Sequence, residues 1–451
     1  MASTGARRPR RSPRRARRPL WWVAVGVVVA AVATAGVVLL LRGPADPPAQ
    51  VAVDDEDHDE AEQDGPPDGD DDPAADDGTE PGADPDAPAP NDEDTLGLPD
   101  GDWERLPTDD VFAVGRERPM VSVTEGGPGL VAVGYDSDRS SAVVWVSEQG
   151  RDWERIPHAE PVFGGDGPQL MDDVTAGGPG LVAAGTDDGS AAVWVSSDGR
   201  TWERVAHDEG VFGGEGRQDM KAVVAGGPGL VAVGRDRGRG SAAVWVSADG
   251  RTWERIDHDE EVFGGDGPQV MTGVATVDDT VVAVGDDRGT DGHAAVWVSE
   301  DGRDWERLDH DAEVFGGPGQ QFMTAVTAGG PGLVAVGHDF GASTPTVWVS
   351  PDGRDWTRTV HEAAEIAGEG SGLMNAVAAG GPGLVAVGQD RETAAAWVSR
   401  DGEAWQRVAH DEAVFGGNGA QAMAAVSPGG PGMVAVGQDE AAGQAAVWLR
   451  E

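Results

Sequence analysis

The chain has 451 residues, no cysteine and a formal net charge of -47 at pH 7. The absence of cysteine excludes a disulfide framework, a thiolate zinc site and a cysteine nucleophile. The strong negative charge opposes binding to polyanions, so we expect no nucleic acid among the partners.

Residues 1–19 are basic and residues 20–41 are apolar and uncharged. An apolar segment of this length forms about 33 Å of helix, enough to cross a hydrocarbon core of ~30 Å. The arginines that precede it predict a single-pass membrane helix with a cytoplasmic N-terminus and an extracytoplasmic remainder. A cleaved signal peptide is the alternative, although its apolar region would span only about 7 to 15 residues.

Residues 42–99 are acidic, rich in proline, alanine and glycine, and almost free of large apolar side chains. Such a segment cannot bury enough surface to offset the entropy of ordering. We therefore expect a disordered, extended linker between the apolar segment and the rest of the chain.

Residues 100–451 consist of one repeat of about 50 residues, used seven times. The second unit holds four short apolar runs, at Met171–Ala176, Leu181–Gly185, Ala191–Ser196 and Thr201–Val205. The tight-turn sequences GGPG and SDGR join the first run to the second and the third to the fourth. Four antiparallel strands per unit predict an all-β, seven-bladed propeller.

The two ends of the repeat region are complementary. The chain finishes with "AAVWLRE", Ala445 to Glu451, which lacks a fourth strand. The first unit begins with "DGDWERL", Asp100 to Leu106, a fourth strand with nothing before it. We therefore predict that the N-terminal strand completes the last blade and closes the ring, which leaves few open edges.

The connection between the third and fourth strands carries a recurrent motif, "SSDGRTW" over Ser196 to Trp202 in the second unit. It resembles the Asp-box of sialidases and related propellers, S-x-D-x-G-x-x-W, but is one residue shorter, and the first unit has Gln149 in place of the aspartate. The resemblance implies a structural turn on the face away from the ligand. The residue types favour the same role, because Asp198 can accept backbone N–H groups, Gly199 permits positive φ and Trp202 can pack between sheets.

The resemblance also implies an alternative function, a sialidase-like glycoside hydrolase. Such enzymes use an arginine cluster, an acidic aspartate and a tyrosine nucleophile paired with a glutamate, usually on six blades. Tyr135 is the only tyrosine here, Glu117 is the glutamate considered as its partner, and the units are nearly equivalent. We assign no catalytic residue, cofactor or metal, and we expect a binding or scaffold module for an envelope or extracellular partner.

Histidine and aspartate recur at fixed positions in the units. We call the tryptophan that ends the recurrent motif, Trp202 in the second unit, the marker tryptophan. A histidine follows it by five positions in six units, and an aspartate follows the second strand in all seven. One hypothesis is a cation-binding ring on one face, although ligands spread around a wide ring cannot all converge on one ion. The preferred hypothesis is a structural histidine–aspartate hydrogen bond in each blade.

Specific recognition is expected where the units differ, on the loops before the first strand and after the second. The basic departures from the repeat lie in the first and third units, accompanied by Tyr135. The candidate residues are Arg116, Arg118, Tyr135, Arg139, Arg217, Arg235, Arg237 and Arg239. Guanidinium groups suit carboxylates of a partner, and the alternative is that these arginines pair with neighbouring aspartates and glutamates.

Overall fold

The repeated apolar runs form seven four-stranded antiparallel sheets in a computed structural model of the chain. The structure describes residues 102–451 apart from 116–117, 290–291, 360–365, 367, 369, 371 and 382. Each sheet is one blade; in the second blade the first three strands are longer than the apolar runs, and the fourth is shorter. In the second blade the strands are β6 (Gln169–Gly177), β7 (Gly180–Asp187), β8 (Ser190–Ser196) and β9 (Trp202–Arg204). The predicted fold class, seven blades of four strands, is therefore confirmed.

The other blades repeat this pattern. Blade 1 comprises β2 (Ser122–Gly126), β3 (Gly129–Asp136), β4 (Ser141–Ser147) and β5 (Glu154–Arg155). Blade 3 comprises β10 (Gln218–Gly226), β11 (Gly229–Asp236), β12 (Ser241–Ser247) and β13 (Trp253–Arg255). Blade 4 comprises β14 (Gln269–Val277), β15 (Thr280–Asp287), β16 (His293–Ser299) and β17 (Trp305–Arg307). Blade 5 comprises β18 (Gln321–Gly329), β19 (Gly332–Asp339), β20 (Thr344–Ser350) and β21 (Thr357–Arg358).

Blade 6 comprises β22 (Gly372–Gly380), β23 (Gly383–Asp390), β24 (Thr393–Ser399) and β25 (Trp405–Arg407). Blade 7 comprises β26 (Gln421–Gly429), β27 (Gly432–Asp439), β28 (Gln444–Arg450) and β1 (Trp103–Arg105). Short helical turns precede several first strands. They are η3 (Asp110–Phe112), α2 (Glu160–Phe163), α3 (Glu260–Phe263) and α5 (Glu412–Phe415).

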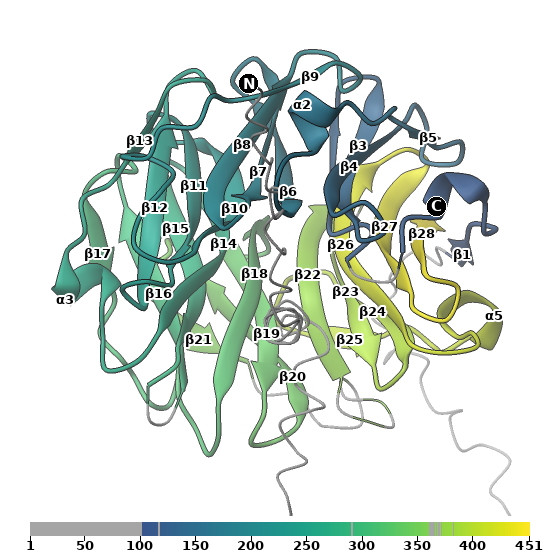
Figure 1. Cartoon of the computed structure of the whole chain (residues 1–451). Helices are drawn as coiled ribbons and strands as arrows, with labels where there is room; N and C mark the ends of the chain where they lie inside the picture. The colour runs from purple at the N-terminus through teal and green to yellow at the C-terminus, as the bar shows by residue number, and fades with distance from the viewer. Residues whose placement is uncertain are drawn as a thin grey trace, which may run out of the picture. The chain divides into compact units, whose positions relative to one another are not determined.

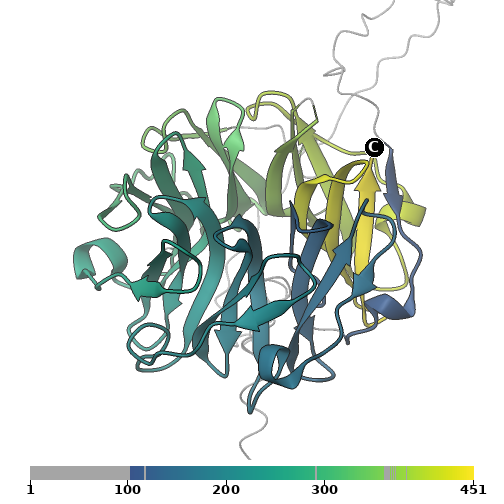
Figure 2. The ribbon, with the colours of Figure 1, turned by 90° about the horizontal axis from the view of Figure 1, so that it is seen from above.

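The first strands of the blades surround the centre of the ring. Each contacts the first strands of both neighbouring blades, including β2 with β26 across the seam between the first and last units. Figures 1 and 2 show the sheets arranged in a ring, with the C-terminal strands in yellow beside the N-terminal strands in blue. Strand β1 pairs with β28, with Trp103 opposite Arg450, so the predicted closure by the N-terminal strand is confirmed.

The hydrophobic core is divided into seven layers, one at each interface between adjacent blades. In the layer between blades 1 and 2, the third-strand Trp194 is fully buried against Val131 and Val144 of the preceding blade. Alternation of valine and alanine with such a tryptophan fills both faces of each sheet, which explains why the second and third strands read as nearly continuous apolar runs.

The SxDG turn between the third and fourth strands is built as the sequence predicts. In blade 2 the Asp198 carboxylate accepts hydrogen bonds from the backbone N–H groups of Arg200 and Thr201, at 2.9 and 2.6 Å. Trp202 donates from Nε1 to the carbonyl oxygen of Gly199 at 2.8 Å. Gly199 has φ of +71°, and a Cβ placed on it would lie 3.0 Å from Cδ of Pro128 in the preceding blade. The turn is thus a joint between blades.

A row of ion pairs connects these turns around part of the ring. In each of five adjacent joints, the arginine after the D-G or Q-G turn bonds the fourth-strand glutamate of the preceding blade. The pairs are Arg151–Glu104, Arg200–Glu154, Arg251–Glu203, Arg303–Glu254 and Arg354–Glu306, at 2.5 to 2.7 Å. At the next joint, Glu403 takes the place of the arginine and Thr357 that of the glutamate.

The propeller has two faces of different composition. The GGPG and SxDG turns lie on one face, which we call the turn face. The loops that enter the first strands and those that follow the second strands lie on the other, which we call the entry face. Because second strands of eight residues separate the two, the faces are about 25 Å apart.

The predicted cytoplasmic tail, membrane helix and acidic linker lie outside the described residues. Within residues 102–451 as described, no helix is long and apolar enough to cross a membrane.

Candidate functional site

The blades differ most along their first strands, close to the centre of the ring. Six of the seven first strands contain a β-bulge immediately after a buried methionine. A bulge leaves one residue unpaired and redirects its side chain. The residues at this position are Asp172, Lys221, Thr272, Thr324, Asn375 and Ala424. The fold therefore places five different residue types at one structural position around the ring.

In three blades the bulge residue reaches the next first strand. Thr272 and Thr324 donate to the carbonyl oxygens of Met323 and Met374, each at 2.7 Å. Asn375 donates from Nδ2 to the carbonyl oxygen of Met423 at 2.9 Å. Blades 2 and 3 carry ionised residues instead, and a charged cluster forms there at the entry face.

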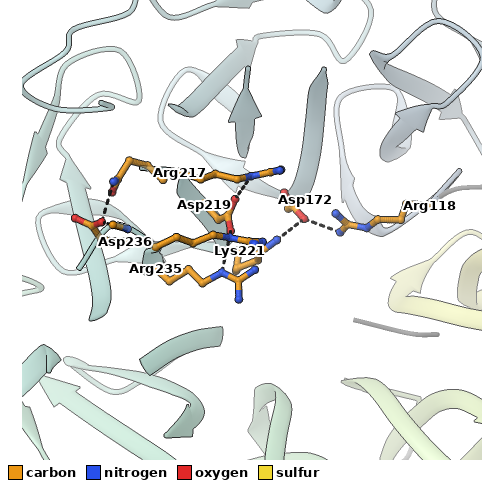
Figure 3. Close-up of polar contacts among 10 residues, drawn as sticks. Arg118, Asp172, Arg217, Asp219, Lys221, Arg235 and Asp236 are labelled. Atoms are coloured by element: carbon orange, nitrogen blue, oxygen red, sulfur yellow. Dashed lines mark hydrogen bonds and ion pairs between the residues drawn. The ribbon is translucent and has the colours of Figure 1, made fainter. Parts of the chain in front are cut away.

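Asp219 on β10 is the first centre of this cluster. Its carboxylate accepts bonds from the Nε atoms of Arg217, Arg235 and Arg237 at 2.7 to 2.8 Å. The Asp219 side chain is only 1% exposed, whereas the three arginines remain partly exposed. Figure 3 shows Arg217 and Arg235 on either side of Asp219. Each arginine uses Nε for this bond, and among the described residues none accepts a hydrogen bond from its Nη groups.

Asp172 on β6 is the second centre. It accepts from Nη2 of Arg118 in blade 1 at 2.5 Å and from Nζ of Lys221 in blade 3 at 3.1 Å. Figure 3 shows these two side chains approaching Asp172 from opposite sides. The Asp172 side chain is 3% exposed. One buried carboxylate therefore connects three blades at the centre of the ring.

The cluster continues into blade 4. Arg288 donates from Nε to the buried Asp286 at 2.5 Å. Asp286 holds in blade 4 the register position that Arg235 holds in blade 3, opposite the residue before the first-strand methionine. Burial lowers the pKa of Arg235, and the charges of Arg237 and Arg288 lower it further, against the raising effect of Asp219. We call these nine residues the entry cluster: Arg118, Asp172, Arg217, Asp219, Lys221, Arg235, Arg237, Asp286 and Arg288.

The entry cluster is cationic within a strongly acidic protein. Six cations surround three carboxylates, an excess of three positive charges when all groups are ionised. Burial raises the pKa of Asp219, but Lys221 and the arginines outweigh this and hold the pKa well below its usual range. Burial lowers the pKa of Lys221 despite the opposing effect of Asp172. A cluster with surplus, partly exposed donors and fixed anions at its base can accept an additional anion.

A further, partly buried carboxylate, Asp173, follows Asp172 on β6. Asp173 accepts from Ser122 Oγ of blade 1 at 2.6 Å and from the backbone N–H of Val223 in blade 3 at 2.8 Å. Burial raises its pKa to about 6, beyond what these hydrogen bonds offset. Its oxygens are occupied by these donors and by Val174 N–H, so Asp173 acts as a bridge between blades.

Only some of the candidate residues proposed from the sequence belong to the entry cluster. Arg118, Arg217, Arg235 and Arg237 belong to the entry cluster. Arg139 and Arg239 pair with Asp136 and Asp236 at the ends of the preceding second strands, at 2.5 and 3.5 Å. Tyr135 and Arg235 lie within second strands rather than in the loops that follow them. Arg116 and Glu117 lie outside the described residues, so no tyrosine–glutamate pair is defined for a glycosidase.

The predicted histidine–aspartate hydrogen bond is contradicted in four blades, while His361 lies outside the described residues. Four of the repeated histidines instead bond the glutamate two residues further on, at 2.9 to 3.2 Å: His158, His207, His258 and His410. The repeated aspartate bonds the arginine of the fourth strand in six blades, as Asp236 does with Arg255 at 2.8 Å. Arg255 also lies 5.5 Å from the ring centre of Trp245. The fourth strand twists its arginine over the third-strand tryptophan, a contact that sequence spacing does not reveal.

These repeated residues line small hollows on the outer part of the blades. One, of about 270 Å³, is bordered by Asp187, Arg204, His207 and Phe212. Its counterpart in the preceding blade repeats the same residue types. Among the described residues no group of three or more histidine, aspartate or glutamate side chains could hold a metal ion.

No known protein family matches the chain in a comparison with family models, and no curated protein matches it either. The sequence reasoning missed Asp172, Asp219, Lys221, Asp286 and Arg288. A signal for them was present, because Lys221 is the only lysine in the chain and the residues flanking the first-strand methionine change from unit to unit.

Proposed function

We propose that the protein is a membrane-anchored binding module whose propeller lies outside the cytoplasm and recognises an acidic envelope or extracellular partner through the entry cluster. A β-propeller is commonly a binding or scaffold module. The observation that carries the proposal is the surplus of partly exposed guanidinium donors fixed around Asp219, on one side of an otherwise acidic ring. Recognition of a single partner requires such a break in sevenfold symmetry.

The Asp-box resemblance supports the assignment of the two faces. In that family the turn is a folding element away from the ligand, and the SxDG turn here packs against a neighbouring blade on the turn face. The entry cluster lies on the opposite face. Placing the ligand there keeps recognition separate from the joints that hold the ring together.

The anion site is tested by calorimetry with inorganic phosphate, using the full chain purified in mild detergent. The double variant Arg217→Gln with Arg237→Ser removes two guanidinium donors. Glutamine and serine already occupy the equivalent positions of other units, as Gln320 and Ser137. Asp219 keeps Arg235 as a partner. We expect phosphate affinity to fall about tenfold or more, because two charged hydrogen bonds are lost.

The matched control is Arg200→Gln with Arg251→Ser on the turn face, which makes the same change in net charge. Both control arginines bond glutamates of neighbouring blades. We expect the control to bind phosphate as the parent does. An equal loss in both variants would show that binding follows net charge alone and would overturn the site.

The membrane arrangement rests on the arginine-rich flank and the uncharged span of residues 20–41. Protease added to intact cells should release the propeller if it lies outside the cytoplasm. Full protection of the propeller in intact cells, with digestion after lysis, would contradict this arrangement.

A further inference from the structure

Two of the eight phenylalanines depart from the repeat. Six follow a valine and precede glycine or alanine in the turn before a first strand, and they are buried in the inter-blade core. Phe322 and Phe340 instead lie in blade 5 at the entry face, and both are only half-buried. No other blade has an aromatic residue at either position. The repeated scaffold therefore does not require these two rings.

The two rings form a compact aromatic group. Their centres are 5.1 Å apart with the planes inclined at 64°. His338, opposite Phe322 in the β18–β19 pairing, lies 4.4 Å from Phe340. Its Nδ1 is 2.9 Å from the carbonyl oxygen of Gly372, which fixes the imidazole against the neighbouring blade. The group is thus held on rigid strands.

The aromatic group occupies the same register as the centre of the entry cluster. Phe322 and His338 are paired in blade 5 as Asp219 and Arg235 are paired in blade 3. Phe340 follows the repeated aspartate as Arg237 does. Equivalent positions in a propeller lie at the same height and distance from the centre. The aromatic group and the cationic centre are therefore two blades apart on one rim.

Arg288 of blade 4 connects the two. Its guanidinium carbon lies 5.2 Å from the ring centre of Phe322, while its Nε bonds Asp286. A cation over an aromatic face is attractive, so the contact holds this guanidinium of the entry cluster against the Phe322 ring. An anion held by this side of the cluster would therefore lie next to the phenylalanine rings.

On this basis we infer that the group recognised at the entry face is an aromatic ring that bears an anionic substituent. The inference rests on the proposed anion site and extends it. The anion accepts from the arginine Nη groups, and its ring packs against the half-exposed faces of Phe322 and Phe340. Aromatic pairs in offset or edge-to-face arrangements add stability beyond the area that they bury.

The test compares phenyl phosphate, cyclohexyl phosphate and inorganic phosphate by calorimetry on the full chain. We expect phenyl phosphate to bind about tenfold more tightly than inorganic phosphate and more tightly than cyclohexyl phosphate, a ratio set by aromatic contacts of about 1 kcal/mol each. Equal affinity for all three would overturn this inference and leave the anion site standing. Failure of all three to bind would overturn the anion site itself.

The matched variant is Phe322→Leu with Phe340→Ser, since other units hold Leu170 and Ser137 at these positions. We expect it to lose the preference for phenyl phosphate and to bind inorganic phosphate as the parent does. Arg217→Gln with Arg237→Ser should weaken both ligands. An unchanged preference in the phenylalanine variant, with the fold intact by circular dichroism, would contradict the role of the rings.

Discussion

The guanidinium of Arg105 donates to the carboxylate of Asp439 at 2.6 Å, across 334 residues of sequence. The same arginine donates to the carbonyl oxygen of Gly416 and lies 5.6 Å from the ring centre of Trp448. Strand β1 thereby supplies the arginine–aspartate–tryptophan contact that blades 3, 4 and 5 make with the arginine of their own fourth strands. The N-terminal strand is chemically, as well as topologically, the fourth strand of blade 7.

Deleting residues 100–107 should destabilise the whole ring. It removes the buried Trp103 from its contact with Phe415 and leaves Asp439 without its arginine. Thermal unfolding followed by circular dichroism should show a much lower melting temperature. Deletion of residues 45–94, which removes no described contact, serves as the comparison. Equal melting temperatures for the two deletions would refute closure by strand exchange.

The SxDG turn should contribute to stability without contributing to binding. Asp198→Ala removes backbone hydrogen bonds within the turn and should lower the free energy of unfolding by about 1 kcal/mol. Trp202→Ala empties a packed position and should lower it by about 3 to 5 kcal/mol. Urea unfolding measures both. Loss of phosphate binding by a variant that remains folded would show that this turn takes part in recognition.

His338 should make the protein less stable in acid. Burial lowers its pKa to about 4, more than the Gly372 carbonyl and Asp339 raise it, while the unfolded value is near 6.5. Between these values the unfolded chain binds more protons, so stability falls as the pH decreases from 6.5 to 4. The fall attributable to this group approaches ~3 kcal/mol.

His338→Asn can keep the bond to Gly372, because the amide nitrogen replaces Nδ1 as the donor. Urea unfolding from pH 4 to 7.5 should therefore show a smaller loss of stability in acid than in the parent. A constant difference between the two proteins over this range would assign the acid sensitivity to other groups.

Lys221→Thr should weaken phosphate binding and reduce its dependence on salt. Threonine holds the same bulge position in blades 4 and 5, so the strand geometry is retained, and Asp172 keeps Arg118 as its partner. Removing one positive charge lowers the attraction for an anion, and salt screens what remains. Calorimetry at several salt concentrations measures both effects. Unchanged affinity at low salt would place Lys221 outside the site.

The fold was predictable because the same pattern of apolar runs and turn sequences recurs in seven units. The turn sequence GGPG marks the first hairpin of six units, and the incomplete units at Asp100 and Glu451 predict the closure. Individual side-chain partners were less predictable. The bulge after each first-strand methionine redirects residues such as Lys221, and the repeat pattern gives no indication of an unpaired residue there. The wrong partner assigned to the repeated aspartate has a similar cause, since the arginine of the fourth strand reaches it only through the twist of the sheet.

The joint at Glu403 and Thr357 shows how far the units can be exchanged. A unit cut at its marker tryptophan carries both partners of one joint, as the unit from Trp305 carries Glu306 and Arg354. The unit from Trp356 to Glu403 replaces both partners together, so neither replacement leaves a charged counterpart behind. Moving that unit to another place in the ring would keep Thr357 and Glu403 together and would leave the ion pairs of the other units intact. The charges of the joints therefore travel with the units, and the order of the units is not encoded in them.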